Sequence, residues 1–272
     1  MQPTTHIVAA TRVDNGQVES VTDHLTAEAA LQLRINGIPF TTTLRTPGHD
    51  HELARGLLFT EDIVTAAETP MAFVETPDHE TGVTACLDIE VEPAKLKAEF
   101  ANHRAHIASS SCGLCGTREL KDIEVYGTAI SLRQTPPLDL QRIPAMLDAV
   151  RESQSAFNTT GGCHAAAAFA GDGRMLLTRE DIGRHNAVDK VIGALIAEQS
   201  LAHATTLLVS GRVSYEIIMK SYRAAFPILL AVSAPSSFAV ESANRFGITL
   251  VAFCRDTRAT VYTHPERIVQ LG

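Results

Sequence analysis

The stretch SSSCGLCGT contains two cysteines, Cys112 and Cys115, at the C-x-x-C spacing that reactive and metal-binding thiols share. A glycine follows each cysteine and serines precede the pair, so the stretch is typical of a polar loop. The chain has five cysteines, and its N-terminus lacks the pattern of a secretory signal. We therefore expect a cytoplasmic protein whose cysteines are free thiols.

Two established uses of such a pair fit the sequence incompletely. A structural zinc site needs four ligands, and the chain has no second C-x-x-C. Cys163 and His164 could complete the set, but neighbouring strand residues point to opposite faces. A thioredoxin-type dithiol needs a helix that begins at its first cysteine, and no helical pattern runs through Cys112.

A third use is sulfur carriage. A thiolate in a loop bounded by Gly113 and Gly116 could accept the terminal sulfur of a persulfide and pass it to an acceptor. The second cysteine could assist the release. The spacing alone leaves zinc binding, dithiol redox chemistry and sulfur carriage open.

The composition limits the classes of protein that the chain can belong to. Its 272 residues are 45% hydrophobic and 20% charged, which is ordinary for a soluble globular protein. The apolar runs are too short to cross a membrane, and a net charge of -8 argues against nucleic-acid binding. Residues 174–260 nevertheless carry a net charge of +3, which leaves -11 for the remainder. This asymmetry favours an anionic ligand in the second half.

The first part of the chain is predicted to be rich in β-strands. Alternating residues flank Asn36-Gly37, which indicates a hairpin. Residues 51–64 show helical spacing, and residues 82–92 alternate again. We expect a smaller β-rich N-terminal domain over residues 1–108, followed by the C-x-x-C loop and a linker over residues 109–137.

Residues 138–272 are predicted to form an α/β domain. An amphipathic helix follows Pro136-Pro137, and residues 159–181 are predicted to be two strands joined by a turn. Helices and apolar strands then alternate; the helices are expected at 184–198, 215–225 and 235–246, and the strands at 205–210, 227–233 and 247–254. Unbroken apolar strands predict a sheet covered on both faces, with a ligand site at the strand ends.

Longer motifs add a resemblance to a known family. They are SSSCGLCG, FNTTGGCHAAA, EDIGRHNAVDKVIG, GRVSYEIIMK, SAPSSFAVESA and FCRDTRATVYTH. In this order and over most of the chain they closely resemble the FdhD family, the formate dehydrogenase accessory sulfurtransferases.

The resemblance implies a sulfurtransferase in which Cys112 takes sulfur as a persulfide from a cysteine desulfurase. The acceptor would be the molybdenum cofactor bis-molybdopterin guanine dinucleotide, which is then inserted into the catalytic subunit of formate dehydrogenase. Cys115 matches the second cysteine of the motif. The resemblance also implies a homodimer and a cytidine deaminase-like fold for the second domain. Guanine nucleotides would mimic the cofactor.

The resemblance further implies a cofactor-binding stretch. It consists of Phe253, Cys254, Arg255, Asp256, Thr257 and Arg258. Arginines at the end of an apolar strand suit phosphate binding, although a solvated surface loop is the plainer reading.

Polar residues of two other motifs are candidates to line the path from Cys112 to the cofactor. They are Arg184, His185, Lys190 and Arg212. The structural alternative is that Asp181 or Asn186 caps the helix that follows.

Two rival functions remain. One is a cofactor-binding chaperone whose C-x-x-C holds structural zinc. The other is a nucleoside deaminase, which would need a glutamate beside its metal ligands. Cys163-His164 is followed by Ala165, so we expect no zinc chemistry there. We expect neither nucleic acid nor membrane as a partner.

Overall fold

The protein is described by a computed structural model over residues 4–97, 128–131 and 137–269. Cys112 and Cys115 lie outside the described residues, as does most of the predicted linker.

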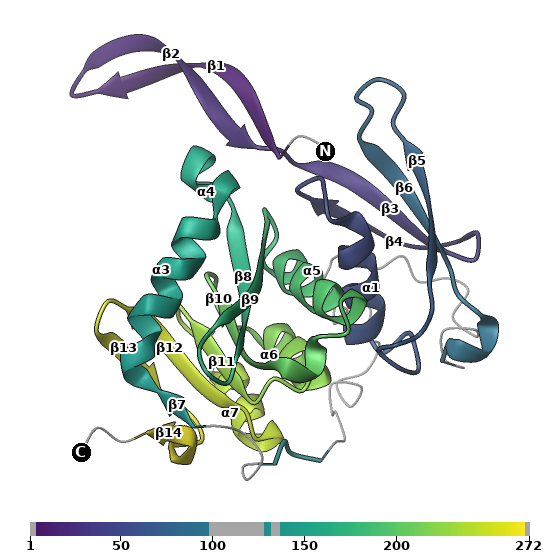
Figure 1. Cartoon of the computed structure of the whole chain (residues 1–272). Coiled ribbons are helices and arrows are strands. Elements are labelled where there is room, and N and C mark those ends of the chain that lie inside the picture. The colour runs from purple at the N-terminus through teal and green to yellow at the C-terminus, as the bar shows by residue number, and fades with distance from the viewer. Residues whose placement is uncertain (1–3, 98–127, 132–136, 270–272) are drawn as a thin grey trace.

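The largest element is a six-stranded sheet in the order β13-β12-β11-β10-β8-β9 (Figure 1). β10, β11 and β12 run parallel, whereas β8, β9 and β13 are antiparallel to their neighbours. The strands are β8 His164–Ala170, β9 Met175–Asp181, β10 Ala204–Val209, β11 Ile228–Ala231, β12 Thr249–Arg255 and β13 Arg258–Val261.

Helices cover both faces of this sheet, as the unbroken apolar strands predicted. The helices are α3 Ile143–Ser153, α4 Ser155–Thr160, α5 Arg184–Ala197, α6 Tyr215–Arg223 and α7 Ser237–Phe246. α5, α6 and α7 share one hydrophobic core with Leu207 of β10. α3 packs on the other face, where the neighbouring Leu208 points. Both leucines are fully buried because successive strand residues face opposite sides.

Smaller elements complete the second half. A short parallel ladder joins β7 Leu138–Asp139 to β14 Ile268–Val269. Single 3-10 turns occur at η1 Pro93–Lys95, η5 Leu140–Arg142, η6 Leu201–His203 and η7 Pro265–Arg267.

The N-terminal part is a four-stranded sheet in the order β4-β3-β6-β5, packed on helix α1. Its elements are β3 Ala29–Ile35, β4 Ile38–Arg45, α1 Asp50–Thr60, β5 Ala72–Pro77 and β6 Thr84–Glu90. Asn36 and Gly37 both have positive φ (51° and 79°), which is the geometry of the predicted tight hairpin.

The two parts meet where α1 crosses α5 at very close range. An added Cβ on Gly56 would lie 1.9 Å from the backbone oxygen of Asp189, and one on Gly193 would lie 1.8 Å from that of Glu52. Only glycine fits at both positions, so this pair sets the distance between the helices.

The structure departs from the sequence prediction in several places. The strands β5 and β13 and the short β7 and β14 were not predicted, and Arg258, expected on a loop, begins β13. Residues 155–160 form α4, whereas a strand was expected to begin at Thr159. The β-branched Thr159 and Thr160 suggested a strand, but their hydroxyls donate to the carbonyls of Ser155 and Ala156 in the preceding turn. In addition, residues 5–26 form a separate hairpin of β1 Thr5–Asp14 and β2 Gln17–Thr26, which the general β-rich pattern did not specify.

Within the described part of the chain, the helices are too short or too polar to span a bilayer.

Candidate functional site

The carboxyl ends of β10, β11 and β12 lie along one edge of the large sheet, and α6 and α7 begin directly after the first two of them. β9 also ends there, because Asp181 pairs with His164 at the start of β8, and α5 follows β9. Three helix N-termini therefore converge on what we call the carboxyl edge. Their free N–H groups and positive dipole ends favour an anion.

His164, Gly211 and Arg184 pack closely together at this edge. The Ser210 hydroxyl accepts a hydrogen bond from the Ala165 N–H (3.0 Å) and lies 3.3 Å from His164 Nδ1. A Cβ on Gly211 would come within 3.3 Å of both His164 Nδ1 and the Arg184 side chain, so glycine lets the three groups meet. Burial, and then the charge of Arg184, lowers the pKa of His164, which favours the neutral imidazole.

Three polar atoms here are buried without a hydrogen-bond partner among the described residues. They are Arg184 Nε, His185 Nε2 and Ser214 Oγ, from the first turn of α5 and the N-cap of α6. Buried polar atoms are nearly always satisfied in native proteins, so a set of unpaired ones points to a missing partner such as a ligand or a water. Burial lowers the pKa of His185 to about 4, assisted by Arg184 and Lys220.

The start of α5 is fixed by Asp181 in a way that the sequence did not predict. Gly183 is the N-cap, and no side chain caps the helix. The buried Asp181 carboxylate instead accepts from the N–H of Gly183 (2.8 Å) and pairs with Lys190 Nζ (2.7 Å). Lys190 is 1% exposed and also donates to the Thr46 carbonyl (2.8 Å). Lys190 is therefore engaged in holding the loop before Arg184.

Residues 253–258 form the end of β12 and the turn into β13. Phe253 and Asp256 have positive φ (54° and 45°), which is uncommon for such residues and marks an irregular segment. Arg255 and Arg258 are opposite each other in the register of β12 and β13, and both side chains are exposed. They lie at the end of an apolar strand, as predicted. Cys254 is 1% exposed, and burial raises its pKa to about 11, so its thiol belongs to the core.

Along the carboxyl edge, the candidate residues of 253–258 lie apart from those around Arg184. β11 and β10 separate β12 from β8, and three strand spacings amount to roughly 14 Å. Arg212 follows β10 between them and is exposed. A ligand that contacts Arg184 and Arg258 together must therefore be long.

The arginines of the carboxyl edge have no ion pair with a carboxylate, whereas most other arginines of the described residues do. Among the described residues, no carboxylate forms an ion pair with Arg184, Arg212, Arg255 or Arg258. Elsewhere ion pairs hold Arg12, Arg34, Arg45, Arg142, Arg151, Arg179 and Arg223. Within the described part of the chain, Arg55, Arg174, Arg245 and Arg267 also lack an ion pair, and Asp256 and Glu216 place some negative charge near the edge. The four edge arginines nevertheless have no carboxylate partner of their own among these residues, which suits an anionic ligand.

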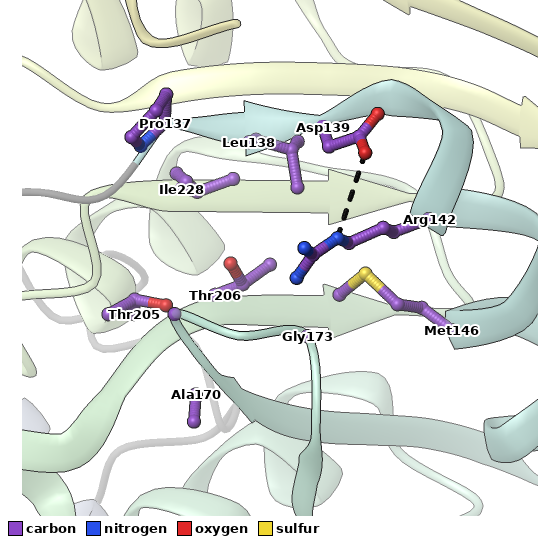
Figure 2. A pocket seen from close by; sticks show the side chains of 11 residues that line it. Pro137, Leu138, Asp139, Arg142, Met146, Ala170, Gly173, Thr205, Thr206 and Ile228 are labelled. Atoms are coloured by element: carbon purple, nitrogen blue, oxygen red, sulfur yellow. Dashed lines mark ion pairs between the residues drawn. The ribbon is translucent and has the colours of Figure 1, made fainter. Parts of the chain in front are cut away.

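A small pocket at the opposite edge of the sheet lacks these properties (Figure 2). It lies between Thr205 and Ile228, near the amino ends of β10 and β11. Its one cation, Arg142, donates to the Asp172 carbonyl and lies 3.7 Å from Asp139. Its charge is already compensated, so we do not assign a ligand to it.

Cys163 and His164 lie next to different partners. The Cys163 thiol is within 3.6 Å of Thr26 Oγ1 and 4.0 Å of Thr46 Oγ1, whereas the His164 ring meets Ser210. Burial raises the pKa of Cys163. Over residues 4–97, 128–131 and 137–269, no group of three or more His, Cys, Asp or Glu is arranged to hold a metal.

Sequence reasoning did not single out Ser210 or the glycine after it. A Ser-Gly pair directly after an apolar strand was the available signal, because such pairs form the tight strand-to-helix turns that bind ligands.

Comparisons with known proteins agree with these motifs. Residues 26–269 match the model of the FdhD/NarQ family. The chain is 40% identical over 262 residues to the sulfur carrier protein FdhD of Mycolicibacterium paratuberculosis, covering 95% of this chain and 96% of that protein. It is 37% identical over 262 residues to the protein of the same name from Sulfolobus acidocaldarius, covering 96% and 97%.

A crystal structure of a proposed formate dehydrogenase accessory protein from Desulfotalea psychrophila has the same mixed α/β fold. The TM-score is 0.77 at 22% identity, covering 98% of this chain and all of that one. On the family match and the identity to these relatives, the chain belongs to the FdhD/NarQ family.

Proposed function

We propose that this protein is a sulfurtransferase required for formate dehydrogenase activity, which carries sulfur on Cys112 to the molybdenum cofactor. Membership of the FdhD/NarQ family supports the proposal, and so do the relatives that are named sulfur carriers. The donor is a cysteine desulfurase, and the acceptor is bis-molybdopterin guanine dinucleotide before its insertion into formate dehydrogenase.

Sulfur capture is a thiol exchange that needs no external oxidant or reductant. The Cys112 thiolate attacks the outer sulfur of the desulfurase persulfide, and the bond to the desulfurase cysteine breaks. The desulfurase leaves as a thiolate, and Cys112 becomes the persulfide.

Sulfur release uses the second cysteine of the motif. The Cys115 thiolate attacks the Cys112 sulfur, the two cysteines form a disulfide, and the outer sulfur leaves as hydrosulfide. This sulfur is thereby reduced by two electrons, which the two thiols supply, and a cellular thiol later reduces the disulfide. Hydrosulfide is a soft ligand of the kind that a molybdenum centre accepts.

The uncompensated arginines of the carboxyl edge are the observation that carries cofactor binding. The cofactor has two pyrophosphate groups, which guanidinium and helix N-terminal N–H groups bind well. We assign Arg255 and Arg258 to one end of it, and Arg184 and Arg212 to the other. The neutral His185 supplies a hydrogen-bonding atom, and Lys190 positions the loop before Arg184 through Asp181.

Mass spectrometry tests the carrier step. The protein is incubated with a cysteine desulfurase and cysteine, without reductant, as wild type, Cys112→Ala and Cys115→Ala. We expect one added sulfur on the peptide that contains Cys112, absent from Cys112→Ala and retained in Cys115→Ala. Cys115→Ala cannot release the sulfur, so if an active desulfurase adds no sulfur to Cys112 in that variant or in the wild type, the carrier function is wrong.

The alternative function is a cofactor-binding chaperone whose C-x-x-C holds zinc. Metal analysis of the purified protein separates the two. Stoichiometric zinc that is lost in Cys112→Ala would favour the chaperone, whereas metal-free protein that accepts sulfur favours the carrier.

A further inference from the structure

Tyr215 and Phe238 stack on each other at the carboxyl edge. Tyr215 is the first residue of α6, and Phe238 lies in the first turn of α7. The centroids of the two rings are 4.8 Å apart, and the ring planes are inclined by 21°. Tyr215 is 9% exposed, whereas Phe238 is 45% exposed. One face of the Phe238 ring is therefore covered by a buried ring, and much of the remaining ring surface faces solvent.

Backbone hydrogen bonds hold the loop before α7 between its two neighbours. The Ser236 N–H of this loop donates to the carbonyl of Val213 (2.9 Å), in the loop after β10. At the other end of the loop, the Ser233 carbonyl accepts from the N–H of Phe253 (3.3 Å), near the end of β12. The loop after β10 carries one arginine of the carboxyl edge, and the end of β12 carries two. The N-terminus of α7, where Phe238 lies, is therefore placed between arginines that have no carboxylate partner among the described residues.

The surroundings of Phe238 distinguish it from the other exposed aromatic side chains. Single apolar side chains on a protein surface are common and need no function. Phe157 lies on α4, and Tyr262 follows β13 near the amino end of β12, where its N–H donates to the Leu250 carbonyl (2.8 Å). Phe238 instead stacks next to the N-cap of α6, where the Ser214 hydroxyl is buried without a hydrogen-bond partner among the described residues. An exposed ring, a hydroxyl without a partner and nearby arginines together suit a ligand that has both a planar ring and anionic groups.

We propose that Phe238 is a stacking residue for a planar ring of the molybdenum cofactor, and that Tyr215 supports its ring from behind. This inference rests on the proposed function, and it adds the part of the site that recognises rings. The cofactor contains guanine and pterin, which are both flat heteroaromatic rings with the same amino-substituted pyrimidinone portion. Aromatic side chains stack on such rings through their π-faces. The arginines can bind the phosphates of any polyphosphate, whereas the stack selects a ligand that carries a ring.

Isothermal titration calorimetry with three probes tests the inference. GDP supplies the guanine, hydroxymethylpterin supplies the pterin, and inorganic pyrophosphate supplies the anionic group without a ring. We expect Phe238→Ala to weaken the binding of GDP at one of its sites, or of the pterin, by roughly 5- to 150-fold, the range for the loss of one stacked base. The affinity for pyrophosphate should stay at its wild-type value. The probe that loses affinity identifies which ring stacks on Phe238.

Two further variants serve as controls. Phe238→Tyr keeps a ring at the same place and should bind all three probes as the wild type does. Tyr262→Ala removes an exposed ring from the opposite edge of the sheet and should also leave binding unchanged. Because Phe238 is exposed, Phe238→Ala should unfold at close to the wild-type temperature.

Wild-type affinities of Phe238→Ala for both GDP and the pterin would overturn the inference, and so would a loss that Tyr262→Ala shares or that extends equally to pyrophosphate. These results would leave the proposed function intact, because capture of sulfur on Cys112 and binding of pyrophosphate by the edge arginines do not involve Phe238. A wild type that binds neither GDP nor pyrophosphate would contradict the cofactor site of the proposed function together with this inference.

Discussion

Lys220 Nζ of α6 lies 2.9 Å from the Asp189 carboxylate of α5, and neither side chain is more than 2% exposed. Lys220 also donates to Thr60 Oγ1 (2.9 Å) and pairs with Glu61 (3.1 Å), at the end of α1. The pair therefore joins the N-terminal part to α5 and α6, two of the three helices that begin at the carboxyl edge. Burial raises the pKa of Asp189 to about 6 against the attraction of Lys220, so the pair stays ionised at neutral pH.

Breaking this pair from one side should be costly. Lys220→Met leaves the buried Asp189 without its cation, and we expect a loss of about 3–5 kcal/mol in the free energy of unfolding. The double variant Asp189→Leu/Lys220→Met should lose much less than the sum of the single variants, because no buried charge remains unpaired. Urea unfolding of the four proteins measures the coupling, and additive losses would contradict it.

Gly56→Ala should destabilise the protein although it raises helix propensity. Propensity alone predicts a gain of about 1 kcal/mol in an exposed helix. The added Cβ would instead lie 1.9 Å from the Asp189 backbone oxygen, which cannot move without its helix. We expect a net loss of about 1–3 kcal/mol by urea unfolding, so the sign of the change decides between the two effects.

The buried His185 should make stability fall in mild acid. Its pKa is about 4 in the folded protein and about 6.5 in the unfolded chain. Between these values the unfolded state binds a proton that the folded state does not, so the contribution of His185 to stability decreases as the pH falls from 6.5 to 4. The raised pKa of Asp189 acts in the opposite direction over much of this range, so the contribution of His185 is obtained by comparing the wild type with a variant. The full contribution of this pKa shift to the free energy of unfolding is about 3 kcal/mol.

Replacing the histidine tests this dependence. The stability of His185→Gln relative to the wild type should rise as the pH falls from 7 to 4, measured by urea unfolding of both proteins at each pH. The exposed His203→Gln serves as the matched control and should keep the wild-type slope. Equal slopes for wild type and His185→Gln would contradict the prediction.

The carboxyl-edge arginines should carry the affinity for guanine nucleotides. GDP serves as the probe, because it supplies the guanine and pyrophosphate of one cofactor arm. One GDP cannot reach both ends of the carboxyl edge, so we expect two GDP sites, one for each cofactor arm. Arg184→Ala should weaken GDP binding at its own end, and Arg258→Ala at the other, by roughly 10- to 100-fold, the range for hydrogen bonds to charged groups. Arg174→Ala removes an exposed arginine from the opposite edge and should bind as the wild type does. Isothermal titration calorimetry gives the affinities, and equal losses in all three variants would count against the site.

Cys163 and Cys254 should not carry sulfur. Both are buried, and burial raises the pKa of both thiols, to about 11 for Cys254. Because the thiolate is the reactive form, iodoacetamide at pH 8 should leave both unmodified in the native protein and label them in urea. Peptide mass spectrometry distinguishes the sites, and rapid native labelling of Cys254 would refute its assignment to the core.

Local signals in the sequence were enough to predict most helices and several strands of residues 138–272. The apolar runs at 205–210 and 227–233 are buried strands because their hydrophobicity is continuous, and Asn36-Gly37 forms the predicted turn because few residues tolerate its φ angles. These signals are local, so they can be read without the fold. The C-x-x-C and the other motifs were likewise visible in the sequence alone.

The contacts of individual polar residues could not be predicted before the tertiary fold was known. Lys190 and Arg184 stand six residues apart on one helix, yet Lys190 is held by Asp181 while Arg184 keeps an unpaired nitrogen at the carboxyl edge. Likewise, nothing local in Gly56 or Gly193 indicates that each faces the backbone of another helix. Burial and pairing depend on contacts between segments far apart in the chain, and side-chain type and spacing do not encode those contacts.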